Sequence, residues 1–152
     1  MKSGVFFKIN FDIGLLLRIV MEKLELQATA KTPFVSFNGE TGKMIIQGRS
    51  IPDNADEYWQ PILQWFYAYS TEPKNTTTFI FDMEYFNISS SKPVLFLLHK
   101  MNDLIESGFE VNIEWRYPQG DEEMLETGND YSCMVKIPFK FVESENNFEL
   151  AV

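Results

Sequence analysis

The sequence contains little that would support metal, redox or general-base chemistry. Its single cysteine, Cys133, cannot form an intramolecular disulfide, which indicates a reducing compartment, and we expect the cytoplasm. With one cysteine and one histidine, His99, the chain lacks the ligands of a Cys/His zinc site. A lone histidine is more often structural or exposed than a general base. Neither glycine-rich phosphate-binding motif occurs. We therefore expect no metal, no cofactor and no enzymatic activity.

Positive charge is also scarce. The 152 residues include 13 lysines and arginines against 22 aspartates and glutamates, which gives a formal net charge of -9. Binding to nucleic acid or to an anionic membrane requires a basic surface that neutralises phosphates. We expect neither partner. The length and the 45% hydrophobic content are typical of one globular domain.

Residues 1–20 differ from the rest of the chain. They are strongly apolar, but Lys8, Asp12 and Arg18 interrupt them, so the uninterrupted runs are too short to span a bilayer. No small-residue cleavage site of a signal peptide precedes Met21. Alternating apolar residues in this segment are compatible with an added edge strand, but we favour an extension upstream of a natural start at Met21. The expected organisation is an N-terminal extension, a single domain and a polar tail, at residues 1–20, 21–143 and 144–152.

From Met21 onward the pattern switches between the two-residue period of strands and the 3.6-residue period of helices. Asn38 and Gly39 form a hairpin signal, and Gly108 is a helix stop. The pattern predicts strands at residues 33–37, 43–47, 76–86, 109–116 and 136–142. It predicts helices that run from Asn54 to at least Tyr69, from about 90 to 106, and from 121 to about 131.

The predicted order of elements is therefore β-β-α-β-α-β-α-β. The last two strands alternate cleanly between apolar and polar residues, which is typical of strands with one wet face. We therefore predict an α/β (α+β) fold in which a mixed β-sheet carries about three helices on one face. The other face is left to water or to a partner.

The junction between the third predicted strand and its helix stands out, because three serines precede Pro93 there. An N-cap carbonyl normally accepts a hydrogen bond from the residue four positions on, and proline has no N–H to give. Ser90 or Ser91 is therefore the expected cap, with Ser89 just outside the helix. A phosphate on Ser89 would meet free N–H groups and a favourable dipole. A plain serine cap without modification is the alternative.

Two groups of carboxylates are weaker candidates. Asp121, Glu122 and Glu123 form an acidic run that is suited to bind a cation, although such runs are usually just solvated. Asp82 and Glu84 lie on one face of a predicted strand. A salt-linked or exposed pair is the favoured interpretation there, ahead of a catalytic acid/base couple.

The residues at this junction, E-Y-F-N-I-S-S-S-K at 84–92, resemble the signature Y-[FL]-N-T-S-S of the SiaC family of regulatory phosphoproteins. Three further segments agree in order and spacing, namely residues 31–37, residues 48–52 leading to Trp65, and residues 128–131 with 137–139. The resemblance runs from about Leu24 to Glu143.

The resemblance implies a fold similar to the STAS domains of anti-sigma factor antagonists. It also implies a non-enzymatic signalling switch. Members are phosphorylated by a partner Ser/Thr kinase and dephosphorylated by a PP2C-type phosphatase, and the unphosphorylated form binds a partner. In the best-known system that partner is a diguanylate cyclase, which the bound protein activates. The phosphoacceptor is the threonine of the N-T-S-S motif.

This sequence has Ile88 at the position of that threonine, and isoleucine cannot accept a phosphate. Two interpretations stay open. Phosphorylation has moved to the neighbouring serines, with Ser89 ahead of Ser90 because it matches the acceptor serine of STAS antagonists, or the switch is lost and the protein stays competent to bind. The expected partner-binding residues are Phe86, Asn87, Ile88, Ser89, Ser90, Ser91 and Lys92.

A second class of function is a constitutive scaffold or oligomerisation module. It would use the bare face of the sheet together with Trp115 and would self-associate without any kinase. An enzyme is the third and least favoured class, because it would need a ligand-sized pocket with a perturbed acid or base.

Overall fold

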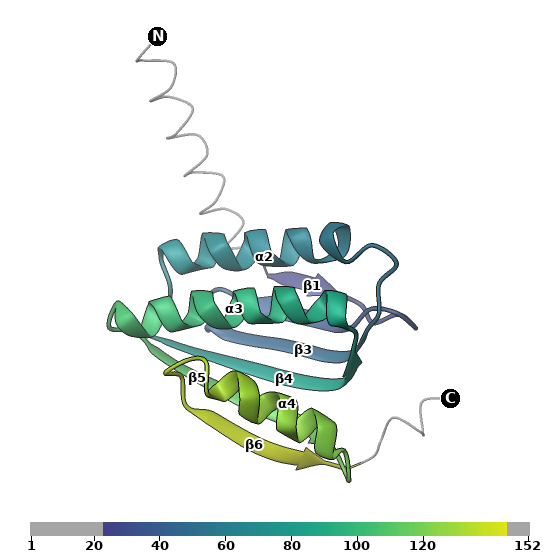
Figure 1. The fold of residues 1–152 in the computed structure, drawn as a ribbon. Helices are drawn as coiled ribbons and strands as arrows, with labels where there is room; N and C mark the ends of the chain where they lie inside the picture. Colours follow the sequence, from purple (N-terminus) through teal and green to yellow (C-terminus); the bar gives the residue numbers. More distant parts are fainter. Residues whose placement is uncertain (1–22, 146–152) are drawn as a thin grey trace.

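The computed structural model describes residues 23–145. A mixed six-stranded sheet carries three helices on one face (Figure 1). The strands follow one another across the sheet in sequence order; the pairs among β1, β2 and β3 are antiparallel, and those from β3 to β6 are parallel. The elements are β1 (Leu24–Leu26), β2 (Phe34–Asn38), β3 (Lys43–Ser50), α2 (Ala55–Thr71), β4 (Thr76–Phe86), α3 (Ile88–Glu106), β5 (Glu110–Pro118), α4 (Glu122–Ser132) and β6 (Phe139–Ser144).

The predicted α/β fold class is confirmed, with one strand more than expected. β1 has three residues, which is too short for a periodic pattern to reveal. β6 begins at Phe139 rather than near Lys136, because Pro138 has no N–H to donate to a strand ladder. The expected extension, the edge strand considered within it and the start at Met21 lie outside the described residues.

The hydrophobic core lies between the sheet and the helices. Phe37 projects from β2 and Phe79 and Phe81 project from β4, and all three are fully buried, because alternate strand residues face the helix layer. Trp115 belongs to the same face of the sheet, where it is fully buried, and its Nε1 donates a hydrogen bond to the Met124 carbonyl at 3.0 Å. The expectation that Trp115 serves a bare sheet face is therefore wrong, because its alternation places it with the covered residues.

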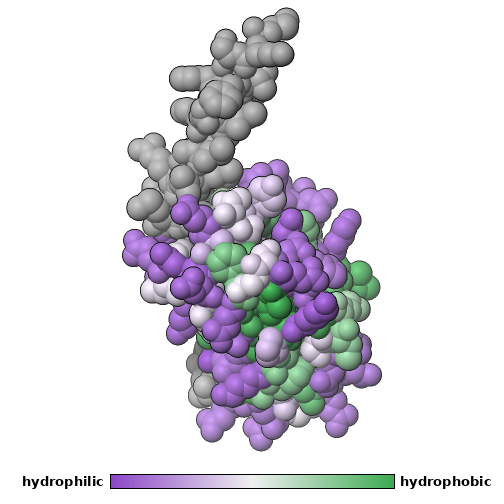
Figure 2. All heavy atoms as spheres, turned by 90° about the vertical axis from the view of Figure 1, so that its left-hand side faces the viewer, coloured by the Kyte–Doolittle hydropathy of each residue, from purple (hydrophilic) through white to green (hydrophobic). Residues whose placement is uncertain are grey.

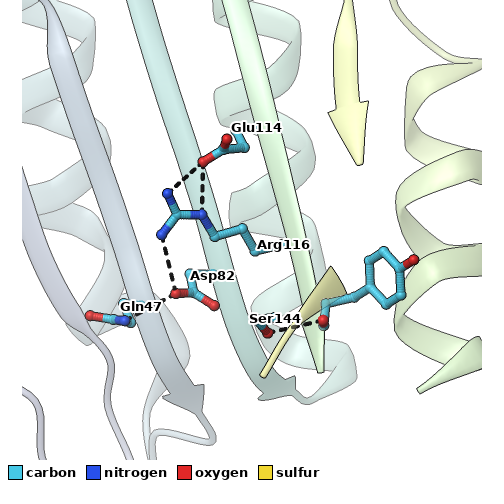
Figure 3. Close-up of polar contacts among 6 residues, drawn as sticks. Gln47, Asp82, Glu114, Arg116 and Ser144 are labelled. Atoms are coloured by element: carbon cyan, nitrogen blue, oxygen red, sulfur yellow. Dashed lines mark hydrogen bonds and ion pairs between the residues drawn. The ribbon is translucent and has the colours of Figure 1, made fainter. Parts of the chain in front are cut away.

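The open face of the sheet carries a polar network that joins three strands (Figure 3). The Arg116 guanidinium contacts a Glu114 carboxylate oxygen at 2.6 and 2.7 Å and lies 3.7 Å from an Asp82 oxygen. Gln47 donates a hydrogen bond to Asp82 at 3.0 Å. The salt-linked interpretation of Asp82 is confirmed, whereas Glu84 takes no part in these contacts. Paired charges at the centre of the open face make it unlike an apolar docking surface.

The end of the molecule at which α2 and α3 finish has a mainly polar surface. Figure 2 shows the end at which α2 and α3 finish, where hydrophilic side chains predominate and hydrophobic ones form a band between them. The junction of β4 and α3 lies at the opposite end (Figure 1). Among the described residues, no helix is both long and apolar enough to cross a bilayer.

Tyr58, in the first turns of α2, makes stability depend on alkaline pH. Its hydroxyl donates to the Pro33 carbonyl at 3.4 Å, and burial raises its pKa from 10.0 to about 12. Between these values the unfolded chain has released this proton and the folded chain still holds it. The free energy of unfolding therefore falls as the pH rises from about 10 to about 12.

Replacing Tyr58 by phenylalanine should remove this share of the alkaline sensitivity. Urea unfolding on either side of pH 10 will measure it. The loss of stability with rising pH is expected to be smaller in Tyr58→Phe than in the wild type. Identical losses would show that Tyr58 ionises equally easily in both states.

Candidate functional site

The candidate site is the corner at which β4 passes into α3. Asn87 caps the helix: its side-chain oxygen accepts from the Ser90 backbone N–H at 3.0 Å, and its carbonyl accepts from the Ser91 N–H at 3.2 Å. The prediction that Ser90 or Ser91 caps the helix, with Ser89 outside it, is wrong. With Asn87 as the cap, Pro93 does not disrupt the start of the helix. Proline has no N–H, so the carbonyl of Ser89, four residues earlier, lacks its helical donor; Ser89 is exposed, and water can supply a donor instead.

The three serines have three different environments. Ser89 is exposed, and its hydroxyl donates to the Asn87 side-chain oxygen at 3.0 Å. Ser90 is fully buried, where its hydroxyl lies 2.8 Å from that of Ser50 and 3.2 Å from the Ser50 carbonyl. The Ser91 hydroxyl donates to the Ile88 carbonyl. Of the three serines, Ser89 is exposed, Ser91 is half-buried and Ser90 is buried.

Ile88 is the most exposed of the large hydrophobic side chains described, at 91%. It occupies the first position of α3, directly beside Ser89. Phe86, by contrast, is half-buried and packs against Trp115 and Tyr131, with ring centroids 6.4 Å apart in both cases. Phe86 therefore supports the corner from below, and Ile88 presents its apolar surface to solvent.

The beginning of α2 completes the site from the neighbouring βα unit. Its first residues and those of α3 enclose an open hollow of about 570 Å³. The hollow is lined by Asp53, Asn54, Ala55 and Asp56 on one side and by Ile88, Ser89, Ser91 and Lys92 on the other. Sequence reasoning missed the contribution of α2, although parallel strands bring their carboxyl ends to one edge of a sheet.

The hollow combines two helix N-termini with charges of both signs. Asp53 is held by Lys31 at 2.9 Å, whereas Asp56 forms none of the ion pairs found within residues 23–145. Lys92 is exposed at the opposite wall. Of the predicted partner-binding residues, the structure therefore brings Ile88, Ser89, Ser91 and Lys92 to one surface, while Phe86 and Ser90 lie beneath it.

α4 supports the corner through Tyr131. This side chain is 8% exposed and packs edge-on against Trp115, with ring centroids 5.8 Å apart. Burial raises the pKa of Tyr131, the Asp130 charge raises it further, and a hydrogen bond with the Ser91 side chain lowers it. Tyr131 is therefore a neutral partner of Ser91 at physiological pH.

The remaining candidates do not form a second centre. Asp121 caps α4 by accepting from the Met124 N–H at 3.0 Å, which explains the beginning of the acidic run. No group of three or more potential metal ligands occurs among the residues that the structure describes. His99 is exposed on α3.

Comparison with known proteins extends the resemblance seen in the sequence. The family model for SiaC family regulatory phosphoproteins matches residues 26–144. The crystal structure of the diguanylate cyclase SiaD in complex with its activator SiaC, from Pseudomonas aeruginosa, contains a similar chain: the TM-score is 0.75 at 21% identity, over 80% of this chain and 99% of that one. Another structure of SiaC from that organism gives 0.74 at 22% identity, over 82% and 100%.

A sequence relative also covers most of the chain. An uncharacterized protein of Pseudomonas aeruginosa strain UCBPP-PA14 is 23% identical over 119 residues, which are 78% of this chain and 94% of that protein. The structural likenesses establish the fold, and the family model spans most of the chain, including every residue of the corner. The chain therefore belongs to the SiaC family of regulatory phosphoproteins.

Proposed function

We propose that this protein is a non-enzymatic switch of the cytoplasm that binds and regulates a partner through the β4–α3 corner. The observation that carries the proposal is Ile88, a hydrophobic side chain 91% exposed beside an exposed serine. Docking would remove this apolar side chain from water, which is favourable by roughly 1.5–3 kcal/mol for a side chain of this size. The related SiaC is described as the activator of the diguanylate cyclase SiaD, and we propose a diguanylate cyclase as the partner here.

Phosphorylation of Ser89 would oppose this docking. A phosphate adds a charge of about −1.5 to −2, and docking would have to strip water from it. It would stand in a hollow that already contains the Asp53 and Asp56 carboxylates, with Lys92 as the nearby cation. The attraction of the helix N-terminus for the phosphate is also reduced, because the Ser90 N–H already donates a hydrogen bond to the Asn87 side-chain oxygen. The unmodified form is therefore the one that binds.

A partner Ser/Thr kinase and a PP2C-type phosphatase would set the phosphorylation state, as the family resemblance implies. Ser89 is the acceptor that accessibility supports. Ser90 is fully buried and hydrogen-bonded to Ser50, so a kinase would have to unfold the first turn of α3 to reach it.

We expect Ser89→Asp to weaken partner binding by about tenfold or more, because the charge is desolvated on docking. Ser89→Asn is the matched control. Asparagine has nearly the same shape as aspartate but no charge, so this variant should bind like the wild type. Isothermal titration calorimetry with the diguanylate cyclases of the source organism will measure both. Equal affinities for the two variants would show that the interface lies elsewhere.

A second candidate, a constitutive binding module, is favoured by the missing hydroxyl at position 88. Incubation with the cognate kinase and ATP, followed by mass spectrometry, separates the two functions. A phosphoswitch predicts phosphate on Ser89 that is lost in Ser89→Ala. A lost switch predicts an unmodified wild type and a phosphorylated Ile88→Thr, because that variant restores the family's acceptor.

A further inference from the structure

α2 and α3 lie side by side and share one outward surface (Figure 1), which we call the helix face. On α2 it contains Asp56, Gln60, Gln64 and Tyr67, all exposed and spaced by four, four and three residues. On α3 it runs from Ile88 and Ser89 through Phe96 to Lys100. The α2 spacings keep that set near one side of its helix. On α3, Ile88 and Ser89 stand at the N-terminal end, and Phe96 and Lys100, four residues apart, share one side further along. The helix face therefore continues from the β4–α3 corner along most of both helices.

The far end of the helix face is aromatic and basic. The Lys100 Nζ lies 5.1 Å from the ring centroid of Tyr67 and 5.6 Å from that of Phe96. Tyr67 is 50% exposed and Phe96 is 40% exposed. Within residues 23–145 no carboxylate forms an ion pair with Lys100. This end thus offers two open rings and a cation that lacks a carboxylate.

The near end of the helix face offers the complementary groups. Ile88 is 91% exposed, and the Asp56 carboxylate has no cation partner among the described residues. Between the two ends lies a hollow of about 370 Å³ whose lining includes Trp59, Leu63 and Pro93. The Trp59 indole N–H is buried without a hydrogen-bond acceptor in the described structure.

We infer that the helix face is self-complementary and docks a second copy of this chain about a two-fold axis. Asp56 and Tyr67 are 11 residues apart on α2, and Ile88 and Lys100 are 12 apart on α3, so both spans are about 16–18 Å at 1.5 Å per residue. An antiparallel pair therefore brings Ile88 onto the rings of the second copy while Asp56 meets Lys100 of that copy. A two-fold axis repeats each contact.

This association covers Ile88 and Ser89, so it competes with the partner for the corner. That consequence rests on the proposed function, whereas the self-association does not. The two-helix surface is small, and interfaces of this kind are typical of weak, transient assemblies. The pair would act as a reserve form that dissociates as the partner binds.

Sedimentation equilibrium of the full chain over a range of concentrations tests the inference. The wild type should show a reversible monomer–dimer equilibrium. Asp56→Lys and Lys100→Glu should each weaken it by about tenfold or more, because each places like charges opposite one another. An equimolar mixture of these two variants should associate again. In the mixed pair the two introduced charges are opposite in sign and face each other, and the unaltered Asp56 of one copy still faces the unaltered Lys100 of the other.

Lys43→Glu, at an exposed lysine on the open sheet face, is the matched control and should leave the equilibrium unchanged. Circular dichroism will establish that each variant is folded. A wild type that stays monomeric, or a mixture that associates no better than either variant alone, would overturn the inference. Both results would leave the partner-binding measurements on Ser89 and Ile88 unaffected, so the two proposals fail separately.

Discussion

Replacing Ile88 by aspartate is expected to weaken partner binding by at least about 30-fold, which corresponds to roughly 2 kcal/mol, the usual threshold of an interface hot spot. The side chain is 91% exposed, so the fold loses almost no buried contact. Aspartate in the first turn of a helix also interacts favourably with the helix dipole. The variant should therefore fold normally, while a charge replaces the apolar surface that the partner is proposed to contact.

Met134→Asp is the matched control for this experiment. Met134 is another large hydrophobic residue with high exposure, 54%, but it follows α4 and does not line the corner hollow. Calorimetric titration of the cyclase with both variants, after thermal melts that establish equal stability, will separate loss of binding from loss of fold. If Ile88→Asp and Met134→Asp bind equally well, Ile88 is not the anchor.

Gly128→Ala is expected to lower the free energy of unfolding by about 1–3 kcal/mol, the range found for overpacked cores. A Cβ atom at this position would lie 2.6 Å from Cδ1 and Nε1 of Trp115, closer than such atoms approach one another. Glycine to alanine within a helix would otherwise gain about 1 kcal/mol from helix propensity. The close approach opposes that gain and determines the sign of the change.

The Trp115 ring cannot move away cheaply. It is fully buried, packs against Phe81 and Phe139, and uses Nε1 to bond the Met124 carbonyl. Moving it would break that bond and open a gap among the neighbouring rings. A fall in melting temperature of roughly 5–10 °C should therefore accompany a loss of about 2 kcal/mol in a domain of this size.

A double-mutant cycle isolates the clash. Trp115→Phe should be destabilising alone, but adding Gly128→Ala to it should cost much less than in the wild type, because the smaller ring leaves space for the methyl group. Glu126→Ala, an exposed change in the same helix, serves as the control and should alter stability little. A Gly128→Ala protein as stable as the wild type would contradict the close approach.

Much of the fold was predictable because its strands carry clear periodic signals. β5 alternates Val111, Ile113 and Trp115 with polar residues, and that alternation is enough to assign one covered and one wet face. The same alternation places Trp115 on the covered side. The packing of Trp115 against Gly128 has no comparable signal. It is a tertiary contact between β5 and α4, and no local sequence pattern shows which residues of two separate elements will meet.

The corner was predictable in place but not in detail. Asparagine and serine cap helices about equally well, so local preference does not distinguish Asn87 from the serines that follow. The choice depends on burial, because Ser90 is placed against Ser50 at the end of the neighbouring strand. Likewise, the contribution of Asp53 and Asp56 follows from the parallel pairing of β3 with β4, a long-range contact that no short motif encodes.

The three parallel strand pairs have a consequence for how the chain reaches this fold. Lys43 pairs with Thr78, Thr78 with Asn112, and Ile113 with Phe139, so partners are 35, 34 and 26 residues apart. Each such pair requires a long loop to close before any ladder bond forms. The local β2–β3 hairpin can assemble early, but completion of the sheet must wait for these distant encounters. Refolding is therefore governed by chain topology and should be slow beside that of a helical bundle of equal length.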